Sequence, residues 1–331
     1  MTRPRISLLA LGGTIAMTRS RPTEGLSPAL DAADLIEAVP GIAHAADVIP
    51  QSVNSKPGAS LTFDDLRAAL AAALAAVADG ADGVVLTQGT DTIEETAYLL
   101  DVWWPRGAPL VVTGAMRSFS QPGSDAPANL LDAVATATMP GASDAGVLVT
   151  MAGEIHAARY VRKSHSTHPG AFTSPELGPV GVVAEGRATI RVRIPTFGAL
   201  PPPVPGIHPR VAVIESVLDD DGHHLSLVAD GGYDGIVLSG CGVGHVSAAA
   251  ADVVGRINGR VPVIFASRTE SGGTRTNTYQ FPGSEHDLID KGAIPAGLLN
   301  ARKARLLLWA LIASDRSREE MRKEFGARGA G

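Results

Sequence analysis

One strand–helix junction in the sequence constrains the fold more than any other feature. Residues 83–86 form a short apolar, β-branched run, which is typical of a buried strand in a parallel sheet. A polar stretch follows, and apolar residues then recur at helical spacing over residues 94–104. A strand followed by a helix is the repeating unit of α/β folds. We expect Thr92 and Glu95 to form the capping box that starts the helix.

Thr90 and Asp91 lie at this junction, after the expected strand and before the expected helix. Open α/β sheets bind their ligands at such points, and the N–H groups and dipole of a helix N-terminus favour negative charge there. A hydroxyl beside a carboxylate at this position indicates an activated nucleophile. An alternative interpretation stays open, in which Asp91 is an ordinary N-cap and Thr90 takes no part in chemistry.

The composition excludes several classes of partner. Hydrophobic residues make up 45% of the 331 residues, so the chain can build two domains with sizeable cores. The net charge of −6 gives no electrostatic basis for binding nucleic acid or an anionic membrane. The single cysteine, Cys241, cannot form an internal disulfide, and the sequence lacks the Cys/His spacings of metal sites. We therefore expect neither nucleic acid nor a membrane as a partner.

The N-terminal segment has basic residues before an apolar run, as secretory signal peptides do. That run, residues 6–11, is too short for a signal-peptide core and leads directly into Gly12 and Gly13. No stretch of the sequence reaches the roughly 20 apolar residues that span a bilayer. We therefore predict a cytoplasmic location.

The order of the expected strands and helices divides the chain into two α/β domains. Strands and helices alternate up to Met151, which predicts a parallel sheet with right-handed crossovers. Residues 154–194 then show short β-like runs between Gly and Pro turns, and residues 196–209 contain five prolines. We predict a larger N-terminal parallel-sheet domain at 1–195, a linker at 196–209 and a smaller C-terminal α/β domain at 210–331.

The individual elements are predicted from the hydrophobic pattern of each segment. Residues 17–30 are expected to form a surface loop of the kind that often serves as a lid, and residues 315–328 a solvated helix or a fraying tail. Strands are expected at residues 5–11, 47–53, 83–86, 109–113, 145–151, 210–215, 235–239 and 262–267, and helices at residues 31–39, 62–78, 94–104, 129–137, 246–257, 287–291 and 301–314.

Three polar segments follow expected strands: ALGGTIAMT at residues 10–18, LTQGTDTIEETAYLLD at 86–101 and VVTGAMRSFSQPGSDAPANLLDAV at 111–134. In order, spacing and wording they closely resemble the bacterial-type L-asparaginase/glutaminase family, and weaker similarity continues through residues 159–172 and 298–308. The resemblance covers nearly the whole chain. It implies a homotetramer built from dimers, and hydrolysis of a small-molecule amide substrate through an acyl-enzyme ester, without metal or cofactor.

The resemblance also implies roles for individual residues. Thr14 matches the usual nucleophile of the family, although by itself it is typical of a helix cap or turn. Thr90, Asp91 and Lys163 match the second catalytic cluster, although Lys163 alone is typical of a solvated surface. Ala115 matches the position whose carbonyl contacts the leaving amide nitrogen. A threonine hydroxyl needs a base to take its proton, and Lys163, oriented by Asp91, is the candidate base; backbone N–H groups of Thr14 and Thr90 are candidate donors to the oxyanion.

Some positions depart from the family's pattern. Gln88 stands where the family usually carries His, and Leu26 lies about where a tyrosine commonly assists the first threonine. Gly58 and Ala59 stand where a serine and a second polar residue usually hold the α-carboxylate of the substrate. Their backbone N–H groups, or the hydroxyl of Ser60, are candidate replacements. These departures leave the choice of substrate open.

The motifs lead to three functional hypotheses. The first is hydrolysis of L-asparagine to L-aspartate and ammonia through a threonine acyl-enzyme. The second is a related amidase that acts on glutamine or another amide, and the third is a non-catalytic sensor of asparagine or aspartate. A tRNA-dependent amidotransferase is disfavoured because only four residues precede the first expected strand. His245 matches a substrate-binding position that often reaches a neighbouring subunit's site; a surface or helix-start histidine is the alternative.

Overall fold

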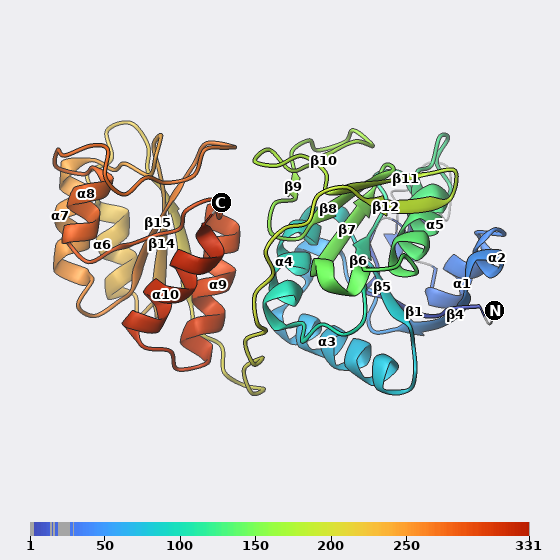
Figure 1. Ribbon diagram of the computed structural model, residues 1–331. Coiled ribbons are helices and arrows are strands. Elements are labelled where there is room, and N and C mark those ends of the chain that lie inside the picture. The colour runs from blue at the N-terminus through green and yellow to red at the C-terminus, as the bar shows by residue number, and fades with distance from the viewer. Residues whose placement is uncertain (1–2, 14, 16, 19–26, 29, 331) are drawn as a thin grey trace. The chain divides into compact units, whose positions relative to one another are not determined.

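The computed structural model describes residues 3–13, 15, 17–18, 27–28 and 30–330 (Figure 1). The chain divides into two compact units, Met1–Ala199 and Leu200–Gly331. Both are α/β units, and the larger one comes first, which confirms the predicted fold class. The finer division, with a linker at residues 196–209, stays a prediction.

The first unit is built on an eight-stranded sheet with the strand order β12-β11-β8-β7-β6-β5-β1-β4. The neighbours among β4, β1, β5, β6 and β7 pair in parallel, whereas β8, β11 and β12 pair antiparallel. The change of rhythm after Met151 is therefore a change from parallel to antiparallel strands. The bounds are β1 (Arg5–Ala10), β4 (Asp47–Ser52), β5 (Gly83–Thr87), β6 (Leu110–Thr113), β7 (Val147–Met151), β8 (Glu154–Ala157), β11 (Gly181–Ala184) and β12 (Arg187–Ile190).

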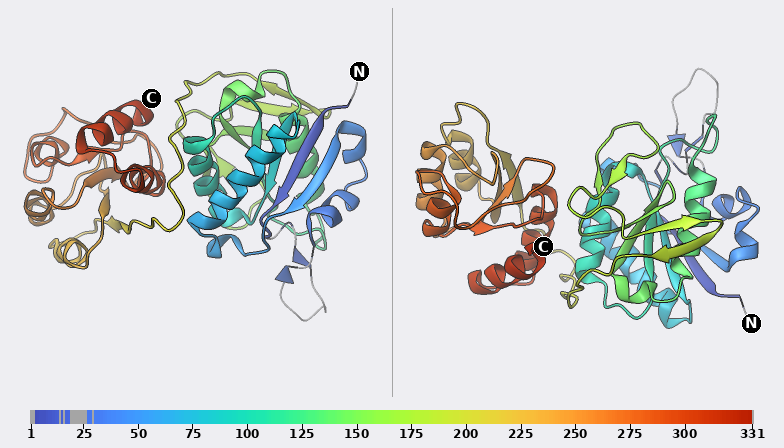
Figure 2. Two further views of the ribbon diagram at one scale, coloured as in Figure 1. Left: turned by 90° about the horizontal axis from the view of Figure 1, so that it is seen from below. Right: turned by 45° about the horizontal axis from the view of Figure 1, so that its top comes forward.

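Helices cover both faces of this sheet (Figure 1, Figure 2). On one face lie α3 (Phe63–Ala78) and α4 (Ile93–Trp103), and on the other lie α1 (Ala32–Glu37), α2 (Ile42–Ala45) and α5 (Ala126–Ala137). Strands β5, β6 and β7 follow one another across the sheet, and their connections, α4 and α5, lie on opposite faces. The two crossovers therefore have opposite hand. The expectation that all crossovers are right-handed is therefore wrong.

Several short elements complete the first unit. Strands β9 (Arg162–Lys163) and β10 (Phe172–Thr173) pair antiparallel and form a hairpin outside the eight-stranded sheet. The others are β2 (Met17–Thr18), β3 (Ser27–Pro28) and the 3₁₀ segments η2 (Gly58–Ser60), η3 (Thr90–Thr92) and η4 (Ala142–Ala145). The predicted loop at residues 17–30 lies largely outside the described residues.

Side-chain caps explain some helix starts but not the one predicted at Thr92. At α3, the hydroxyl of Thr62 accepts from the N–H of Asp65 and the Asp65 carboxylate accepts from the N–H of Thr62, which is a capping box. Thr92 makes no cap bond. Its hydroxyl donates to the carbonyl of Gly58 at 3.0 Å. The predicted capping box of Thr92 is wrong because the hydroxyl oxygen accepts from the side-chain amide of Gln88 at 3.2 Å and not from a helix N–H.

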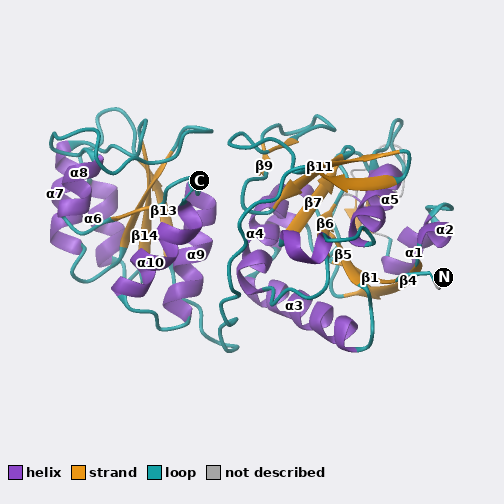
Figure 3. Cartoon of the chain, in the orientation of Figure 1, coloured by secondary structure: helices purple, strands orange, loops and turns teal. Residues whose placement is uncertain are grey.

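The second unit is a four-stranded parallel sheet with the order β13-β14-β15-β16 (Figure 3). Its strands are β13 (Val211–Glu215), β14 (Gly235–Gly240), β15 (Val263–Ser267) and β16 (Ile294–Pro295). Its helices are α6 (His223–Asp230), α7 (Ala248–Ile257), α8 (Glu285–Asp290), α9 (Ala301–Ala313) and α10 (Arg318–Gly329). Apolar side chains of β14, β15, α7 and α8, such as Leu238, Phe265, Val254 and Leu288, form one buried cluster.

The C-terminal segment forms a packed helix. Residues Met321 and Phe325 of α10 are buried, so a fraying tail is excluded and the helix covers apolar surface. Among the described residues, none of the helices combines the length and the apolar character needed to cross a membrane.

Candidate active site

The carboxyl ends of β1 and β5 lie side by side and bring two glycine-containing loops together. Ala10 is opposite Thr87 in the parallel register, and the N–H of Leu11 donates to the carbonyl of Thr87 at 2.9 Å. Gly13 has a φ of +89°, and a Cβ there would overlap the backbone of Gly89. Only glycine allows this backbone conformation and this close approach. The loop after β1 is thereby fixed against the loop after β5.

A third glycine, Gly58, packs on the same loop. A Cβ at Gly58 would lie 2.9 Å from the carbonyl oxygen of Gly89 and 3.3 Å from the hydroxyl of Thr92. Gly58 begins the η2 turn and is buried, whereas Ala59 and Ser60 are exposed on the same turn. Of the three predicted substrate-binding residues here, the structure brings Gly58 against Gly89.

Thr90, Asp91 and Lys163 come together at the amino end of α4. Lys163 Nζ lies 2.9 Å from Thr90 Oγ1 and 2.6 Å from Asp91 Oδ1. Thr90 is buried and the Lys163 side chain is 13% exposed, whereas that of Asp91 is 69% exposed. The amine therefore links a buried hydroxyl to a carboxylate that is open to solvent.

Lys163 reaches this position because its backbone is bonded to α4. Its N–H donates to Glu94 Oε2 at 3.0 Å, and Glu94 is buried at 3% exposure. On the other side, Lys163 pairs with Phe172 in the β9–β10 hairpin. Glu94 was not predicted from the sequence, although a charged residue on the apolar face of a helix, three positions after Asp91, is a signal that could have indicated it.

The loop after β6 adds Ala115 to the same region. The Asp125 carboxylate accepts from the N–H of Met116 at 3.0 Å, and the Asn129 amide donates to the carbonyl of Gly114 at 3.0 Å. A Cβ at Gly114 would lie 2.6 Å from the carbonyl oxygen of Gln88, so this loop also approaches the loop after β5. Ala115 is fully buried. Asp125 and Asn129, at the start of α5, are positioning residues that sequence reasoning missed.

A shallow, open cavity of about 340 Å³ lies beside the candidate cluster and is lined by Asp91, Lys163, Ser164, His165 and Ser166. A cavity of about 380 Å³ elsewhere in the first unit is lined by residues that include Met139, Ile190 and Arg193, none of them a candidate site residue. Thr14 and Leu26 lie outside the described residues. The catalytic and binding roles of the candidate residues stay predictions.

His245 belongs to a separate cluster in the second unit. Its Nε2 lies 2.9 Å from Oε2 of Glu285, a fully buried carboxylate, and its ring packs edge-on against Tyr279 and Phe281 at 5.0 Å between centroids. The N–H groups of Thr278 and Tyr279 donate to Glu285 Oε1 at 2.8 and 2.7 Å. Burial alone would raise the pKa of Glu285, but the hydrogen bonds from Tyr279, His245 and Thr278 outweigh it and lower that pKa.

Family models match both units of the chain. Residues 5–195 match the asparaginase N-terminal domain, and residues 210–325 match the glutaminase/asparaginase C-terminal domain. The chain belongs to the asparaginase family. The family resemblance of the three loop segments, and with it the prediction of an enzyme, is confirmed.

Named relatives of this asparaginase-family chain include two kinds of protein. A probable L-asparaginase of Deinococcus radiodurans is 34% identical over 97% of both chains. A glutamyl-tRNA(Gln) amidotransferase chain of Methanosarcina mazei is 30% identical over 94% of this chain and 75% of its own length. The crystal structure of a probable cytoplasmic L-asparaginase from Campylobacter jejuni matches with a TM-score of 0.87 and 31% identity, over 98% of this chain and 99% of that one.

Proposed function

We propose that this protein hydrolyses L-asparagine to L-aspartate and ammonia through an acyl-enzyme ester on Thr14. The observation that carries the proposal is the position of Lys163 Nζ, 2.9 Å from Thr90 Oγ1 and 2.6 Å from Asp91 Oδ1. The amine is shielded and is held by the Thr90 hydroxyl and the Asp91 carboxylate, so it can accept the proton of a nucleophilic hydroxyl from the neighbouring loop.

Thr14 is the proposed nucleophile because of its place in the chain. It directly follows Gly13, whose backbone lies against Gly89, and Gly89 directly precedes Thr90. The threonine oxygen attacks the side-chain amide carbon, the C–N bond breaks, and the nitrogen leaves as ammonia after it takes a proton. Water then hydrolyses the ester and returns the hydroxyl. Backbone N–H groups of Thr14 and Thr90 stabilise the oxyanion, typically by a factor of about 10²–10³ for each donor.

Lys163 and Asp91 have different roles in this proposal. Lys163 takes the proton of the Thr14 hydroxyl, directly or through a water molecule, and Asp91 orients the amine of Lys163. Because the Asp91 carboxylate is largely exposed, it also receives the α-ammonium group of the substrate. The carbonyl of Ala115 contacts the leaving nitrogen. These roles follow from the family resemblance, and the contacts among Thr90, Asp91 and Lys163 support them.

We also propose a cytoplasmic homotetramer built from dimers, in which His245 contributes to the site of a neighbouring subunit. The anchoring of the His245 ring by Glu285 supports a fixed functional orientation over an unconstrained surface histidine. Sedimentation equilibrium tests the tetramer. Mixing a Thr14→Ala chain with a His245→Ala chain tests the shared site, because hybrid tetramers would recover activity that neither variant has alone; absence of recovery contradicts it.

A related amidase, acting on glutamine or another amide, is the second candidate. Two observations favour it: the similarity to an amidotransferase chain, and the lack of room for a side chain at Gly58, where the family usually has a serine. Comparing kcat/KM across asparagine, glutamine and N-substituted amides separates the two candidates, since the preferred amide has the highest value.

Ammonia release on addition of L-asparagine is the direct test of the main proposal. We expect release by the unmodified protein and its loss in the Thr14→Ala and Thr90→Val variants. Full activity in both variants would contradict the assigned roles. Thermal stabilisation by asparagine or aspartate without turnover would indicate a sensor instead.

A further inference from the structure

The loop between β9 and β10 carries a histidine, His165, to which the family resemblance assigns no role. His165 lies two residues after Lys163 and lines the same cavity as Asp91 and Lys163. The cavity is open to solvent through exposed Ser164, His165 and Ser166, whereas Lys163 is shielded. His165 therefore lies on the solvent-exposed side of this cavity, beside the shielded Lys163.

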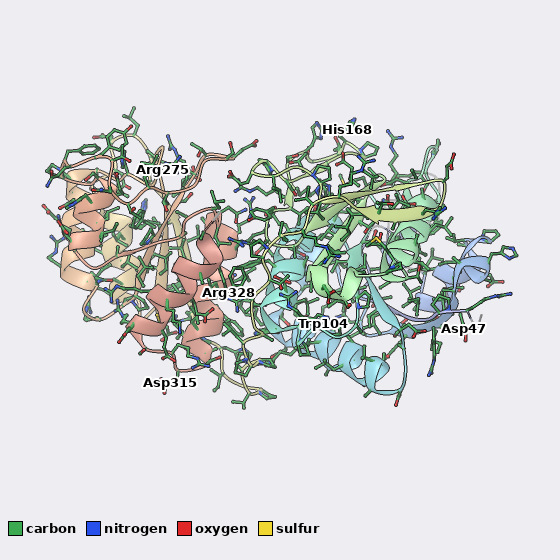
Figure 4. All side chains as sticks on the ribbon, in the orientation of Figure 1. Asp47, Trp104, His168, Arg275, Asp315 and Arg328 are labelled. Carbon is green, nitrogen blue, oxygen red and sulfur yellow. The ribbon has the colours of Figure 1, made fainter. Side chains whose placement is uncertain are left out.

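The imidazole of His165 is held in one orientation by its own loop. Its Nδ1 accepts hydrogen bonds from the N–H groups of Thr167 at 3.1 Å and His168 at 3.0 Å. The proton of the neutral ring therefore lies on Nε2, which is a hydrogen-bond donor. Figure 4 shows His168 on the same exposed loop.

The ends of this loop are closed by hydrogen bonds. The N–H of Ser164 donates to the carbonyl of Ala171 at 2.7 Å, and the Ser164 hydroxyl donates to the same oxygen at 2.9 Å. Because Lys163 and His165 flank Ser164, the same closure fixes both with respect to each other. The Nε2–H donor of His165 is thus presented by a preorganised loop, which reduces the entropy lost when a ligand binds.

The turn at residues 58–60 offers few side-chain donors to a carboxylate. Gly58 has no room for a side chain, because a Cβ would lie 2.9 Å from the Gly89 carbonyl oxygen. Ala59 is apolar, and the Ser60 N–H is bonded to the carbonyl of Pro57 at 2.9 Å. On this turn the Ser60 hydroxyl and the N–H groups of Gly58 and Ala59 are the remaining donors, and the loop after β9 offers a further side-chain donor in His165.

The chemistry of an α-amino acid places that donor. Its ammonium and carboxylate are attached to the same carbon, so the group that binds the carboxylate must lie close to the group that binds the ammonium. Asp91 is the proposed partner of the ammonium, and His165 lines the same cavity. We propose that His165 binds the α-carboxylate of the substrate through Nε2–H and thereby helps to decide which amides the site accepts. This inference rests on the proposed function and names its substrate class.

The kinetic test compares L-asparagine with 3-aminopropanamide, which is asparagine without its α-carboxylate. We expect His165→Ala to lower kcat/KM for L-asparagine by about 10- to 100-fold, mostly through KM, because a charge-assisted hydrogen bond is lost. The value for 3-aminopropanamide should change by less than about twofold on the same reasoning. His165→Gln keeps an N–H donor and should recover part of the loss.

His168→Ala is the matched control. Its ring lies in the same loop, 5.8 Å from the His165 ring between centroids, while its backbone N–H, which orients His165, is retained in the variant. We expect the control to keep the kinetic constants of the unmodified protein. An equal loss on both substrates in His165→Ala, or an unchanged KM for L-asparagine, would overturn the inference.

A binding measurement separates this inference from the hydrolase proposal. If the unmodified protein releases no ammonia, the hydrolase proposal fails, and calorimetric titration with L-aspartate and with β-alanine, which lacks the α-carboxylate, decides the role of His165. Tighter binding of L-aspartate that is lost in His165→Ala supports the inference. The same preference in His165→Ala, or no preference in the unmodified protein, overturns it.

Discussion

Each unit of the molecule contains a carboxylate bonded to a basic side chain, and the two pairs differ in which partner is buried. In the first unit the Asp91 side chain is 69% exposed and its partner Lys163 only 13%. In the second unit Glu285 is fully buried and its partner His245 is 20% exposed. An exposed carboxylate can exchange its partner for a ligand, whereas a buried one with donors on both oxygens acts as a fixed anchor. The first pair is suited to chemistry and the second to orientation.

The largest effect is expected at Lys163. Replacing it with methionine keeps the apolar part of the side chain and removes the amine. We expect kcat for ammonia release to fall by about 10²–10⁴-fold, the usual contribution of a general acid–base group. Lys291→Met is the control, since Lys291 is also paired with an aspartate, Asp287, but lies in the second unit. If the Lys163 variant kept more than a tenth of the activity, the contrast between the two pairs would fail.

The next effect is expected on stability, at Glu285. Glu285→Ala leaves the N–H groups of Thr278 and Tyr279 and the ring of His245 without their acceptor. We expect the free energy of unfolding to fall by about 2–4 kcal/mol, measured by urea denaturation followed by circular dichroism. A loss below about 0.5 kcal/mol, the size typical of ordinary surface substitutions, would show that Glu285 is not an anchor.

The pH dependence of the same group has a definite sign. Hydrogen bonds from Tyr279, His245 and Thr278 lower the pKa of Glu285 below 4.5 in the folded protein, despite its burial. A carboxyl with a lowered folded pKa stabilises the protein fully above its unfolded pKa, and this stabilisation is lost as the pH falls through the folded pKa. The stability difference between the unmodified protein and Glu285→Gln should therefore be greatest near neutral pH and shrink below about pH 4.5.

A smaller effect on stability is expected at Gly58, which separates backbone packing from substrate binding. Restoring the family's usual serine by Gly58→Ser places a Cβ 2.9 Å from the Gly89 carbonyl oxygen. We expect a loss of about 1–3 kcal/mol from overpacking, with no gain in affinity for asparagine. Ala59→Ser, on the exposed part of the same turn, is the control. A lower KM at unchanged melting temperature in Gly58→Ser would contradict this account.

The smallest effect on stability is expected at Asp91. Asp91→Asn removes one charge of a pair whose carboxylate is largely solvated, and exposed pairs contribute little. We expect the free energy of unfolding to change by less than about 1 kcal/mol, while ammonia release decreases. A stability loss as large as that of Glu285→Ala would mean that the two carboxylates do not differ as proposed.

Much of the first unit could be predicted from local patterns. The strand and helix predicted at residues 83–86 and 94–104 are β5 and α4, and their predicted bounds differ from the observed ones by at most one residue. Alternation up to Met151 gave the parallel part of the sheet, because buried parallel strands are recognisable as apolar runs. The hand of the α5 crossover was not predictable in this way, since it depends on which face the helix packs against.

In the candidate site too, some residues could be predicted from the local sequence and others only from the tertiary structure. The hydroxyl of Thr90 and the carboxylate of Asp91 follow a strand in the sequence, so their place at the sheet edge is a local property. Glu94 and Asn129 were missed because their importance depends on burial and on bonds to distant loops. Thr92 was misassigned for the same reason, since its hydroxyl donates to a carbonyl 34 residues away and accepts from the Gln88 side chain.

The sequence by itself determined the α/β character of both units, the order of the polar loops and the family to which the chain belongs. These follow from hydrophobic periodicity and from the residues that make up the motifs, which are properties of contiguous residues. Only the tertiary structure decided that Lys163 meets Thr90 across 73 positions of the chain, and that Gly13, Gly58 and Gly89 leave no space for side chains between their loops. Contacts of that kind are set by how the strands and helices pack, and packing leaves no local pattern in the sequence.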